Sequence, residues 1–442
     1  MKMEVQITSK DTIKPSSPTP PHLRNYKLSL LDHLIPAPYA PIVLFYPCNT
    51  DYVISLDLLR QSLSKTLTRF YPLAGTMKDD LSIDCNDEGA YYVETRVNCT
   101  LDHFLTKPDL VLIHKFFPCD LILKESAGTF ASNFQVNVFE CGGIAIGICI
   151  SHKVVDGAAL STFIKAWSGA ARGCGEAILP DFVASSLFPT SDLWLRDSSI
   201  AMWGSLFRLG KCRTQRFVFD SSAITGLKAK ANLKLCPTRV EAVSGFLWKC
   251  LMNASEKKHG SPRPSFLTHL VNLRRRISHP TLENSMGNLL WIAATRCVVE
   301  HKPGLKHFVT EVKEATSKID GEFVKTLRSD EGSSVMSDSF KEIGELGRQG
   351  VECFGFSSWC KFGFYDADFG WGKPVWVSSF GMDGSVFINL IMLNDTRFGD
   401  GIEAWVTLDE EEMNILEHNP ELVEFASLDP SPLHIGESKP CC

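Results

Sequence analysis

An alternating run of apolar residues near the middle of the chain is the feature that most limits its fold. Between Phe134 and Ile150 apolar side chains recur at every second position, and small residues stand between the last four isoleucines. This period predicts a buried strand with one face that a neighbour or a ligand could approach closely. Apolar residues from Leu160 to Trp167 then repeat at helical spacing, which predicts a helix that ends near Gly173.

The other patterns mix strands and helices without a regular βαβ alternation. Helical spacing predicts helices near residues 59–70 and 238–252, strand-like runs cover 3–9 and 265–273, and a hairpin-like pair spans 386–407. This mixture predicts an α/β chain with mixed sheets rather than a doubly wound Rossmann fold.

The length of the chain suggests more than one domain. At ~100 to 200 residues per domain, 442 residues are enough for two or three domains with a cleft between them. Residues 173–213 have weak periodicity and many Ser, Pro and Gly residues, which is typical of a crossover between domains.

The charge balance argues against a nucleic-acid partner. The chain has 45 Lys and Arg against 51 Asp and Glu, and its formal charge is −6. A phosphate backbone would therefore need a local basic patch, and the only compact one, residues 274–276, is too small.

The cysteines and the N-terminus predict a cytoplasmic protein. The 15 cysteines form no CxxC pair, which disfavours zinc ribbons and dithiol redox motifs and fits small buried side chains in a reducing compartment. The N-terminal residues lack the apolar core of a signal peptide. The longest apolar stretch near the middle, residues 141–150, is about half the length of a membrane span, so we expect no membrane association.

The segment SHKVVDG at residues 151–157 is the sharpest local motif. Asp156 stands where a helix N-cap belongs, and its carboxylate can accept the N–H groups of the first turn. His152 follows a buried strand, and strand ends at a domain boundary are common places for catalytic side chains. From spacing alone, a catalytic His152 and an incidental histidine beside a capping aspartate are equally good interpretations. A metal site is disfavoured because no third ligand is near.

A second motif, DADFGWGKP, occupies residues 366–374. Asp366 and Asp368 could bind a metal, but the dense Gly and Trp favour a tight aromatic turn. Asp-Phe-Gly occurs in protein kinases, yet the chain has neither HRD nor a Gly-rich loop followed by a VAIK-type lysine, so we reject a kinase. A third glycine for a dinucleotide loop is missing. GxSxG and GxxxxGK[ST] are absent too, which leaves serine hydrolase and P-loop activities without support.

Together the two motifs resemble the BAHD acyl-CoA-dependent acyltransferases of plants. HxxxDG at residue 152 is followed about 215 residues later by DFGWG, and further matches span most of the chain. These are YPLAG at 71–75, VNLRRR at 271–276, GN at 287–288 and SSWC at 357–360. The start IKPSSPTP and the FYD before DFGWG are similar to the branch of alkaloid and terpenoid O-acetyltransferases that contains vinorine synthase.

The resemblance implies two domains similar to chloramphenicol acetyltransferase, with an active-site channel at their interface. We expect an N-terminal domain with HxxxD over residues 1–190, a crossover linker over 191–215 and a C-terminal domain with DFGWG over 216–442. A segment near 366–390 is expected to be able to pack with the N-terminal domain. CoA would enter the channel from one side and the acceptor from the other.

The resemblance also implies roles for the HxxxDG residues. His152 would be the general base that takes a proton from an acceptor hydroxyl, which then attacks the thioester carbonyl of acyl-CoA, with no covalent acyl-enzyme. An unperturbed histidine titrates at about 6.5, which suits this role. Asp156 would pair with Arg274 rather than with His152, and would be both an N-cap and an organiser of the site.

Other residues are assigned to the oxyanion and to CoA by the same resemblance. Ser357 and Trp359 are the candidate oxyanion donors. The helix start at Thr238 and the loop that begins at Asn272 are candidates for CoA. The full set of expected CoA-site residues is Thr238, Arg239, Asn272, Arg274, Arg276, Ser357, Ser358 and Trp359. Asp368 is the third candidate catalytic residue, although in the family its motif usually lies away from the histidine.

We therefore expect an enzyme that transfers acetyl from acetyl-CoA to a hydroxyl of a bulky alkaloid or terpenoid alcohol. It would act as a monomer, with acyl-CoA as co-substrate and with no metal or permanent cofactor. The alternatives are another acyl-CoA or an amine acceptor, a thioesterase, and a catalytically silent binding relative.

Overall fold

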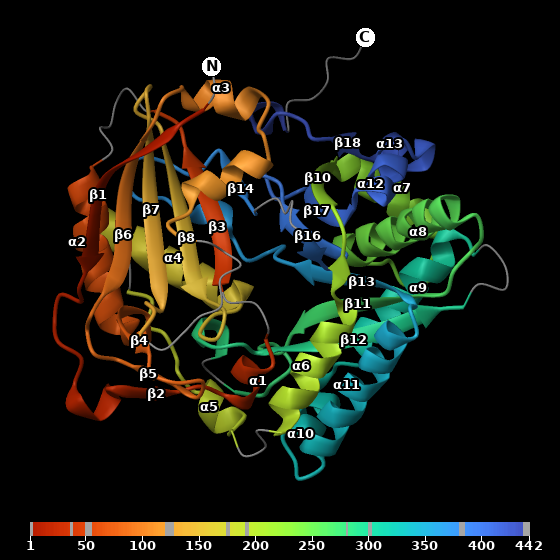
Figure 1. The fold of residues 1–442 in the computed structure, drawn as a ribbon, viewed down its shortest axis with the longest axis horizontal. Helices are drawn as coiled ribbons and strands as arrows, with labels where there is room; N and C mark the ends of the chain where they lie inside the picture. Colours follow the sequence, from red (N-terminus) through yellow and green to blue (C-terminus); the bar gives the residue numbers. More distant parts are fainter. Residues whose placement is uncertain are drawn as a thin grey trace.

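In a computed structural model of the protein, two main β-sheets stand side by side, each with helices packed on it (Figure 1). The structure describes residues 3–35, 39–48, 55–119, 128–173, 177–190, 194–279, 282–298, 303–379 and 385–435. Within these residues the fold is mixed α/β with two domains, as predicted. Each main sheet contains parallel and antiparallel pairs, so the prediction of mixed sheets is also confirmed.

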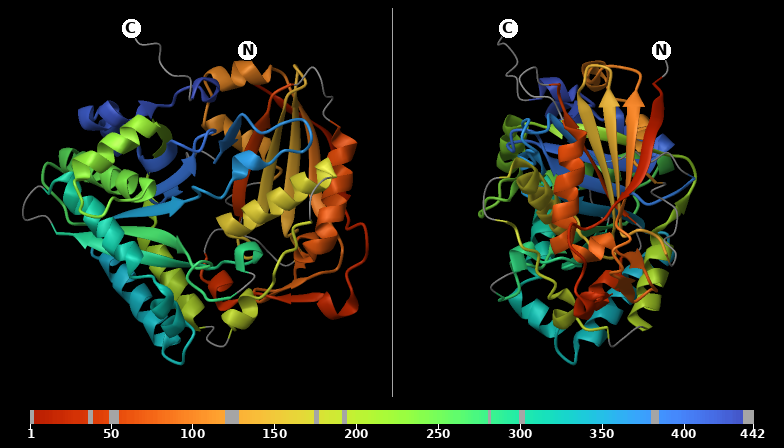
Figure 2. Two further views of the ribbon diagram at one scale, coloured as in Figure 1. Left: turned by 180° about the vertical axis from the view of Figure 1, so that it is seen from behind. Right: turned by 90° about the vertical axis from the view of Figure 1, so that its left-hand side faces the viewer.

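The N-terminal sheet has the order β1-β6-β7-β8-β3-β14. Its strands are β1 (Val5–Ile13), β6 (Ala90–Val97), β7 (Ser132–Phe139), β8 (Ile144–Ser151), β3 (Tyr39–Tyr46) and β14 (Trp376–Ser378). Helices α2 (Leu56–Arg69) and α4 (Gly157–Arg172) cover one face and share a core with the isoleucines of β8. Helix α3 (Leu101–Thr106) and the 3-10 segment η3 (Val111–Phe116) cover the other face. Figure 2 shows this sheet from two further sides.

The C-terminal sheet has the order β12-β11-β13-β16-β17-β10-β18. Its strands are β12 (Leu290–Cys297), β11 (Ser265–Asn272), β13 (Glu352–Ser358), β16 (Leu390–Asp395), β17 (Ile402–Asp409), β10 (Cys212–Phe219) and β18 (Ser427–Leu428). One face is covered by α7 (Ser221–Ala231), α8 (Arg239–His259), α9 (Leu305–Ser317), α12 (Glu410–Glu417) and α13 (Pro420–Phe425). The other is covered by α6 (Trp194–Leu206), α10 (Gly321–Leu327) and α11 (Gly332–Arg348).

Short elements complete the described part of the chain. They are α1 (Leu30–His33), α5 (Ala184–Leu187), the sheet of β2 (Asn25–Lys27), β5 (Ser82–Asp84) and β4 (Thr76–Met77), and the pair of β9 (Arg208–Leu209) and β15 (Val386–Phe387).

The alternating run at 134–150 is two strands, not the single strand that its period suggested. A turn at residues 140–143 separates β7 from β8, and Gly142 takes a φ of +84° there. The predicted close approach to the small-residue face is confirmed, because a Cβ on Gly147 would lie 2.0 Å from the carbonyl oxygen of Phe116. The alternation lapses at Glu140 and Gly142 and resumes in the same phase at Ile144, so the two strands read as one run in the sequence.

The other predicted elements form with different ends. Strand β1 runs on to Ile13, and helix α8 continues to His259 because no proline or glycine stands between Met252 and Gly260. The hairpin of β16 and β17 is antiparallel as predicted, but it begins at Leu390. Residues 386–387 pair instead with β9.

A strand from the C-terminal half of the sequence completes the N-terminal sheet. Strand β14 pairs with β3, with Trp376 opposite Phe45. The Trp376 ring stacks between Phe45, at a centroid distance of 5.2 Å, and Trp405 of the other sheet, at 5.8 Å. The guanidinium of the fully buried Arg216 lies 4.9 Å from the Trp376 ring centre. This stack joins the two domains through one tryptophan.

The segment expected to be a linker, residues 191–215, contains regular structure where it is described. Residues 194–206 form helix α6, which packs along α11, and residues 212–215 already belong to β10. Leu195, Ser199, Met202 and Leu206 are the buried positions of α6, at spacings of three and four. A serine interrupts that stripe, and the outer face carries the exposed apolar residues Trp194 and Ile200, so the helical period is faint in the sequence.

The described helices were also compared with the length and hydropathy of a membrane span. None of them is both long and apolar enough to cross a bilayer.

Candidate active site

His152 lies in a tight loop between β8 and α4, where the two domains meet. Val154 and Val155 donate their N–H groups to the carbonyl of Ser151, so the loop turns at once after the strand. Across the interface, Gly287 donates its N–H to the carbonyl of Val154 at 2.8 Å. The loop is therefore held by its own strand and by residues of the other domain.

Asn288 sets the proton position on the His152 ring. Its side-chain Nδ2 donates to the carbonyl of His152 at 2.6 Å and to Oδ1 of Asp32 at 2.9 Å, so both amide hydrogens are used. Its Oδ1 then faces Nδ1 of His152 at 3.1 Å and can only accept. Nδ1 must carry the ring proton, and Nε2 is left with the lone pair that a general base needs.

Asp32 holds Asn288 in this arrangement. It is fully buried, and its carboxylate accepts from the backbone and side chain of Asn288 and from the backbone and hydroxyl of Ser29. Burial raises the pKa of the Asp32 carboxyl, and the bonds from Ser29 and Asn288 oppose that rise. The chain Ser29–Asp32–Asn288–His152 thus connects the first helix of the sequence with the candidate base.

Asp156 is the predicted N-cap and is turned away from His152. Its Oδ1 accepts from the N–H of Ala159 at 2.9 Å. Its Oδ2 accepts from Nη1 of Arg274 at 2.6 Å and from the N–H of Leu289 at 3.1 Å. The pairing with Arg274 that the resemblance implied is therefore present, and it ties the start of α4 to the C-terminal domain.

Burial is the largest influence on the His152 ring and lowers its pKa. A backbone bond of His152 itself, the charge of Asp156 and the bond to Asn288 all act in the opposite direction. The ring is consequently neutral at neutral pH, which is the state of a histidine that accepts a proton.

A cavity of about 50 Å³ opens beside His152. Both domains line it, and the predicted residues Asn272, Ser357, Ser358 and Trp359 are among its walls. The remaining lining residues are Asp156, Gly157, Ala158, Leu270, Leu290 and Phe362. The sequence prediction that His152 and the SSW segment meet is confirmed by this shared cavity, which we call the inner cavity.

Gly157 allows Trp359 to lie against the start of α4. A Cβ on Gly157 would be 2.7 Å from Nε1 of Trp359 and 2.9 Å from Cε2 of Phe362. Only a residue without a side chain leaves room for both rings. The glycine of HxxxDG is thus explained by packing at the inner cavity.

Two larger cavities follow outside the inner one. The first, of about 350 Å³, shares Ala158, Asn272 and Phe362 with the inner cavity. Its lining includes five cationic residues and one carboxylate, that of Glu283; the cationic residues are Lys165, Arg274, Arg275, Arg276 and Lys361. The second, of about 390 Å³, shares Lys361 with the first and adds Lys373, Arg397 and Phe398. The chain therefore places a positively charged cavity beside the candidate base, and we call this first outer cavity the vestibule.

The structure corrects the expectation that Arg274 contacts CoA. Its side chain is 3% exposed, and its guanidinium donates to Asp156 and to the carbonyls of Ser285 and Gly287. Arg274 is nevertheless among the lining residues of the vestibule, together with its exposed neighbour Arg275. Three consecutive arginines could not be told apart in the sequence, because burial of one depends on Asp156 from the other domain.

Thr238 and Arg239 line none of these cavities. Thr238 and Glu241 form a capping box at the start of α8, which occupies the N–H groups that were expected to meet phosphate. Arg239 pairs with Asp395 at 2.9 Å and donates to the carbonyls of Gly399 and Gly401. Arg239 thereby holds the β16–β17 turn, and the contact of these two residues with CoA stays a prediction.

Asp368 is not at the reaction centre. Its Oδ1 accepts from the N–H groups of Gly370 and Gly372 at 2.8 and 3.0 Å, and it is not among the residues that line the inner cavity. The catalytic assignment of Asp368 is therefore wrong on geometry. The preference for a tight aromatic turn is confirmed, since Phe369 and Trp371 pack with Tyr46 in the N-terminal core.

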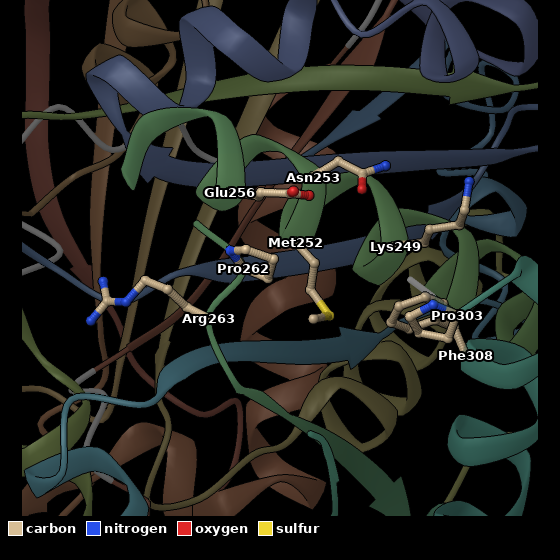
Figure 3. Close-up of a pocket in the computed structure, with 8 residues that line it drawn as sticks. All are labelled: Lys249, Met252, Asn253, Glu256, Pro262, Arg263, Pro303 and Phe308. Atoms are coloured by element: carbon tan, nitrogen blue, oxygen red, sulfur yellow. The ribbon is translucent and has the colours of Figure 1, made fainter. Parts of the chain in front are cut away.

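Two other polar sites in the described residues carry no chemistry. The cavity in Figure 3, on α8, measures about 30 Å³, roughly the space of one water, and its Lys249 and Arg263 are paired with Glu421 and Glu352. A cluster of His259, Glu352 and Glu412 has metal-like spacing. Arg263 lies 2.7 Å from Glu352 and 3.1 Å from His259, so a cation already fills that position.

Sequence reasoning missed the roles of Asn288 and Asp32. Asn288 was part of a matched GN pair without a function, and Asp32 carried no signal beyond a capping pattern with Ser29. Their importance depends on contact between residues 256 positions apart, which no local spacing reveals.

Comparison with known proteins agrees with this geometry. The model of the Transferase family matches residues 3–423 of the chain. The chain therefore belongs to the BAHD acyltransferase family. Among relatives of this BAHD protein, the epi-neemfruitin B 7-O-acetyltransferase of Melia azedarach is 45% identical and covers 98% of this chain and 100% of its own. The limonoid 7-O-acetyltransferase of Citrus sinensis is 44% identical, with the same two coverages.

Among solved structures, the crystal structure of vinorine synthase matches with a TM-score of 0.81 and 31% identity, over 97% of this chain and 100% of the other. As a member of the family, the protein is an acyl-CoA-dependent O-acyltransferase that acts on a hydroxyl of a specialised metabolite.

Proposed function

We propose that this BAHD enzyme transfers acetyl from acetyl-CoA to a secondary hydroxyl of a limonoid-type triterpenoid alcohol. The observation that carries the proposal is the neutral His152, whose Nε2 is left unprotonated by Asn288 beside a cavity lined from both domains. The acceptor class is supported by the two relatives named for acetylation at a 7-hydroxyl.

The base would act in a ternary complex of enzyme, acetyl-CoA and alcohol. Nε2 of His152 takes the hydroxyl proton as the oxygen attacks the thioester carbonyl, and the imidazolium then returns the proton to the leaving CoA thiolate. A base of this kind contributes ~10²- to 10⁴-fold, and alignment of the two substrates in one channel can contribute more. The Nδ1 proton stays on the His152 ring throughout and remains hydrogen-bonded to Oδ1 of Asn288.

The oxyanion of the tetrahedral intermediate would form near Trp359. The indole Nε1 of Trp359 lies against the first turn of α4, and Ser357 lines the same cavity. Donors fixed before the reaction stabilise a developing negative charge at little cost in reorganisation. Ser358 accepts from the N–H of Cys360 and supports the turn that presents Trp359.

The phosphates of CoA would lie in the vestibule. Lys165, Arg275, Arg276 and Lys361 converge there, and the cavity with Arg397 and Phe398 continues from Lys361. The neck formed by Ala158, Asn272 and Phe362 leads from this charged region to His152, so the pantetheine arm would pass it with the thioester first.

The protein would work as a monomer in the cytoplasm. Every residue assigned to the site comes from one chain, so no second copy is needed to complete it. The described cysteines form no disulfide bonds with one another, which suits a reducing compartment.

The test is turnover by the purified protein with acetyl-CoA and a limonoid alcohol that has a free 7-hydroxyl. We expect thiol release only with the alcohol, and a product heavier by one acetyl group. His152→Ala should abolish both. Thiol release at the same rate without alcohol would indicate a thioesterase, and identical behaviour of wild type and His152→Ala would exclude the proposed enzyme.

A further inference from the structure

The inner cavity and the vestibule meet at a neck of three residues. Ala158, Asn272 and Phe362 line both of these cavities, and Trp359 lines both the inner cavity and the second outer cavity. A group that passes from the vestibule to His152 passes the Phe362 ring.

We propose that Phe362 is the residue that sets acyl-donor length, and that with Leu270 and Leu290 it restricts this enzyme to acetyl and similarly short acyl groups. The inference rests on the proposed transfer from acyl-CoA. It adds a specificity role for a residue to which neither motif assigns a function.

The size of the inner cavity supports a short acyl group. Its volume of about 50 Å³ is about one seventh of that of the vestibule outside the neck, which measures about 350 Å³. The thioester carbonyl must reach both His152 and Trp359, so the acyl carbons have to lie inside the neck. Three heavy atoms fit this space far better than a butyryl or benzoyl group.

The walls around the acyl position are apolar. Leu290 on β12 stands opposite Asn272 on β11, and Leu270 lies two residues before Asn272 on the same face of the strand. The Phe362 ring closes the side nearest the vestibule. A methyl group would contact these three side chains, whereas a carboxylate-bearing donor such as malonyl would find no cation within the inner cavity of the described chain.

Phe362 is held in place and cannot swing aside easily. The N–H of Phe362 donates to the carbonyl of Trp359 at 3.3 Å. The carbonyl of Phe362 accepts from the hydroxyl of Ser161 on α4. Its ring packs edge-on to Phe364, with centroids 6.2 Å apart, and rests over Gly157. Contacts with both the α4 helix and the aromatic turn therefore fix the width of the neck.

The experiment compares acetyl-, butyryl- and benzoyl-CoA as donors for wild type and Phe362→Ala with the same limonoid alcohol. Wild type should favour acetyl-CoA strongly. Because a methylene of misfit changes kcat/KM by roughly 10- to 200-fold, Phe362→Ala should raise the butyryl-to-acetyl ratio of kcat/KM by at least about 10-fold. An unchanged ratio would overturn the inference.

Two further variants keep the test decisive. Leu290→Ala enlarges the inner cavity from the wall opposite the neck, so it should shift the ratio in the same direction even if Phe362→Ala folds poorly. Phe398→Ala removes an exposed ring of the outer cavity and should leave the ratio unchanged. Acetyl transfer by wild type with no change of donor in either inner variant would reject the donor-length role alone. No transfer from any donor by wild type would instead reject the proposed function.

Discussion

Asn288 and His152 are joined by two hydrogen bonds in opposite directions, from Nδ2 of Asn288 to the His152 carbonyl at 2.6 Å and between Nδ1 of His152 and Oδ1 of Asn288 at 3.1 Å. One residue thus fixes both the backbone and the ring of the candidate base. Because Asn288 belongs to the other domain, the tautomer of His152 depends on correct docking of the domains.

The first prediction concerns Asn288 as a positioning residue. Asn288→Ala should lower kcat by about 10- to 100-fold, in line with other residues that orient a catalytic ligand, because Nδ1 loses its acceptor and the ring can turn. KM for acetyl-CoA should change little, since Asn288 lines neither cavity of the donor side. Steady-state kinetics with varied donor concentration checks this division.

Asn419→Ala is the matched control for that variant. Asn419 is also buried, but it caps α13 and contacts no site residue. Its loss should cost about 1 kcal/mol of stability without a change in kcat. An equal fall of kcat in both variants would mean that Asn288 acts through stability only.

The second prediction is the position of the acid limb in the pH profile. Burial lowers the pKa of His152 below its ordinary value of 6.5, so a larger fraction of the enzyme carries the neutral base at mildly acidic pH. The acid limb of the logarithm of kcat/KM should therefore be centred below pH 6.5, with a plateau towards pH 8. A limb centred above pH 6.5 would contradict a desolvated His152 as the base.

A third prediction compares two glycines of the same helix. Gly157→Ala should abolish most activity, because its Cβ would lie 2.7 Å from Nε1 of Trp359 and would push the indole out of the inner cavity. The helix itself should tolerate alanine. Gly169→Ala on α4 meets nothing within 4 Å and should stabilise the protein by up to ~1 kcal/mol with full activity. Activity assays and thermal unfolding of the two variants give the answer.

The motifs predicted much of the site, but they failed for residues whose role depends on burial by distant parts of the chain. The N-cap role of Asp156 could be predicted because a cap depends on residues three positions apart. Its pairing with Arg274 was implied only by resemblance to a family. Arg274 was assigned to CoA as well as to Asp156, and Arg275 received no role, because only the fold determines which of three adjacent arginines is buried. The motif also led to a catalytic assignment for Asp368, whereas in the fold its carboxylate closes a turn formed by the glycines that follow it.

The last prediction separates these two arginines. Arg274→Met leaves the Asp156 carboxylate buried without its cation, and loss of one partner of a buried pair costs about 3–5 kcal/mol. Unfolding by urea should begin at a lower concentration, and kcat should fall because Asp156 no longer ties the start of α4 to the other domain. Arg275→Met should leave stability within about 0.5 kcal/mol, as expected for an exposed side chain, and should raise KM for acetyl-CoA, because this arginine faces the vestibule. The urea midpoint and the KM for acetyl-CoA are measured for both variants. A change of KM alone in Arg274→Met would contradict this assignment, since loss of a buried structural arginine should also lower stability.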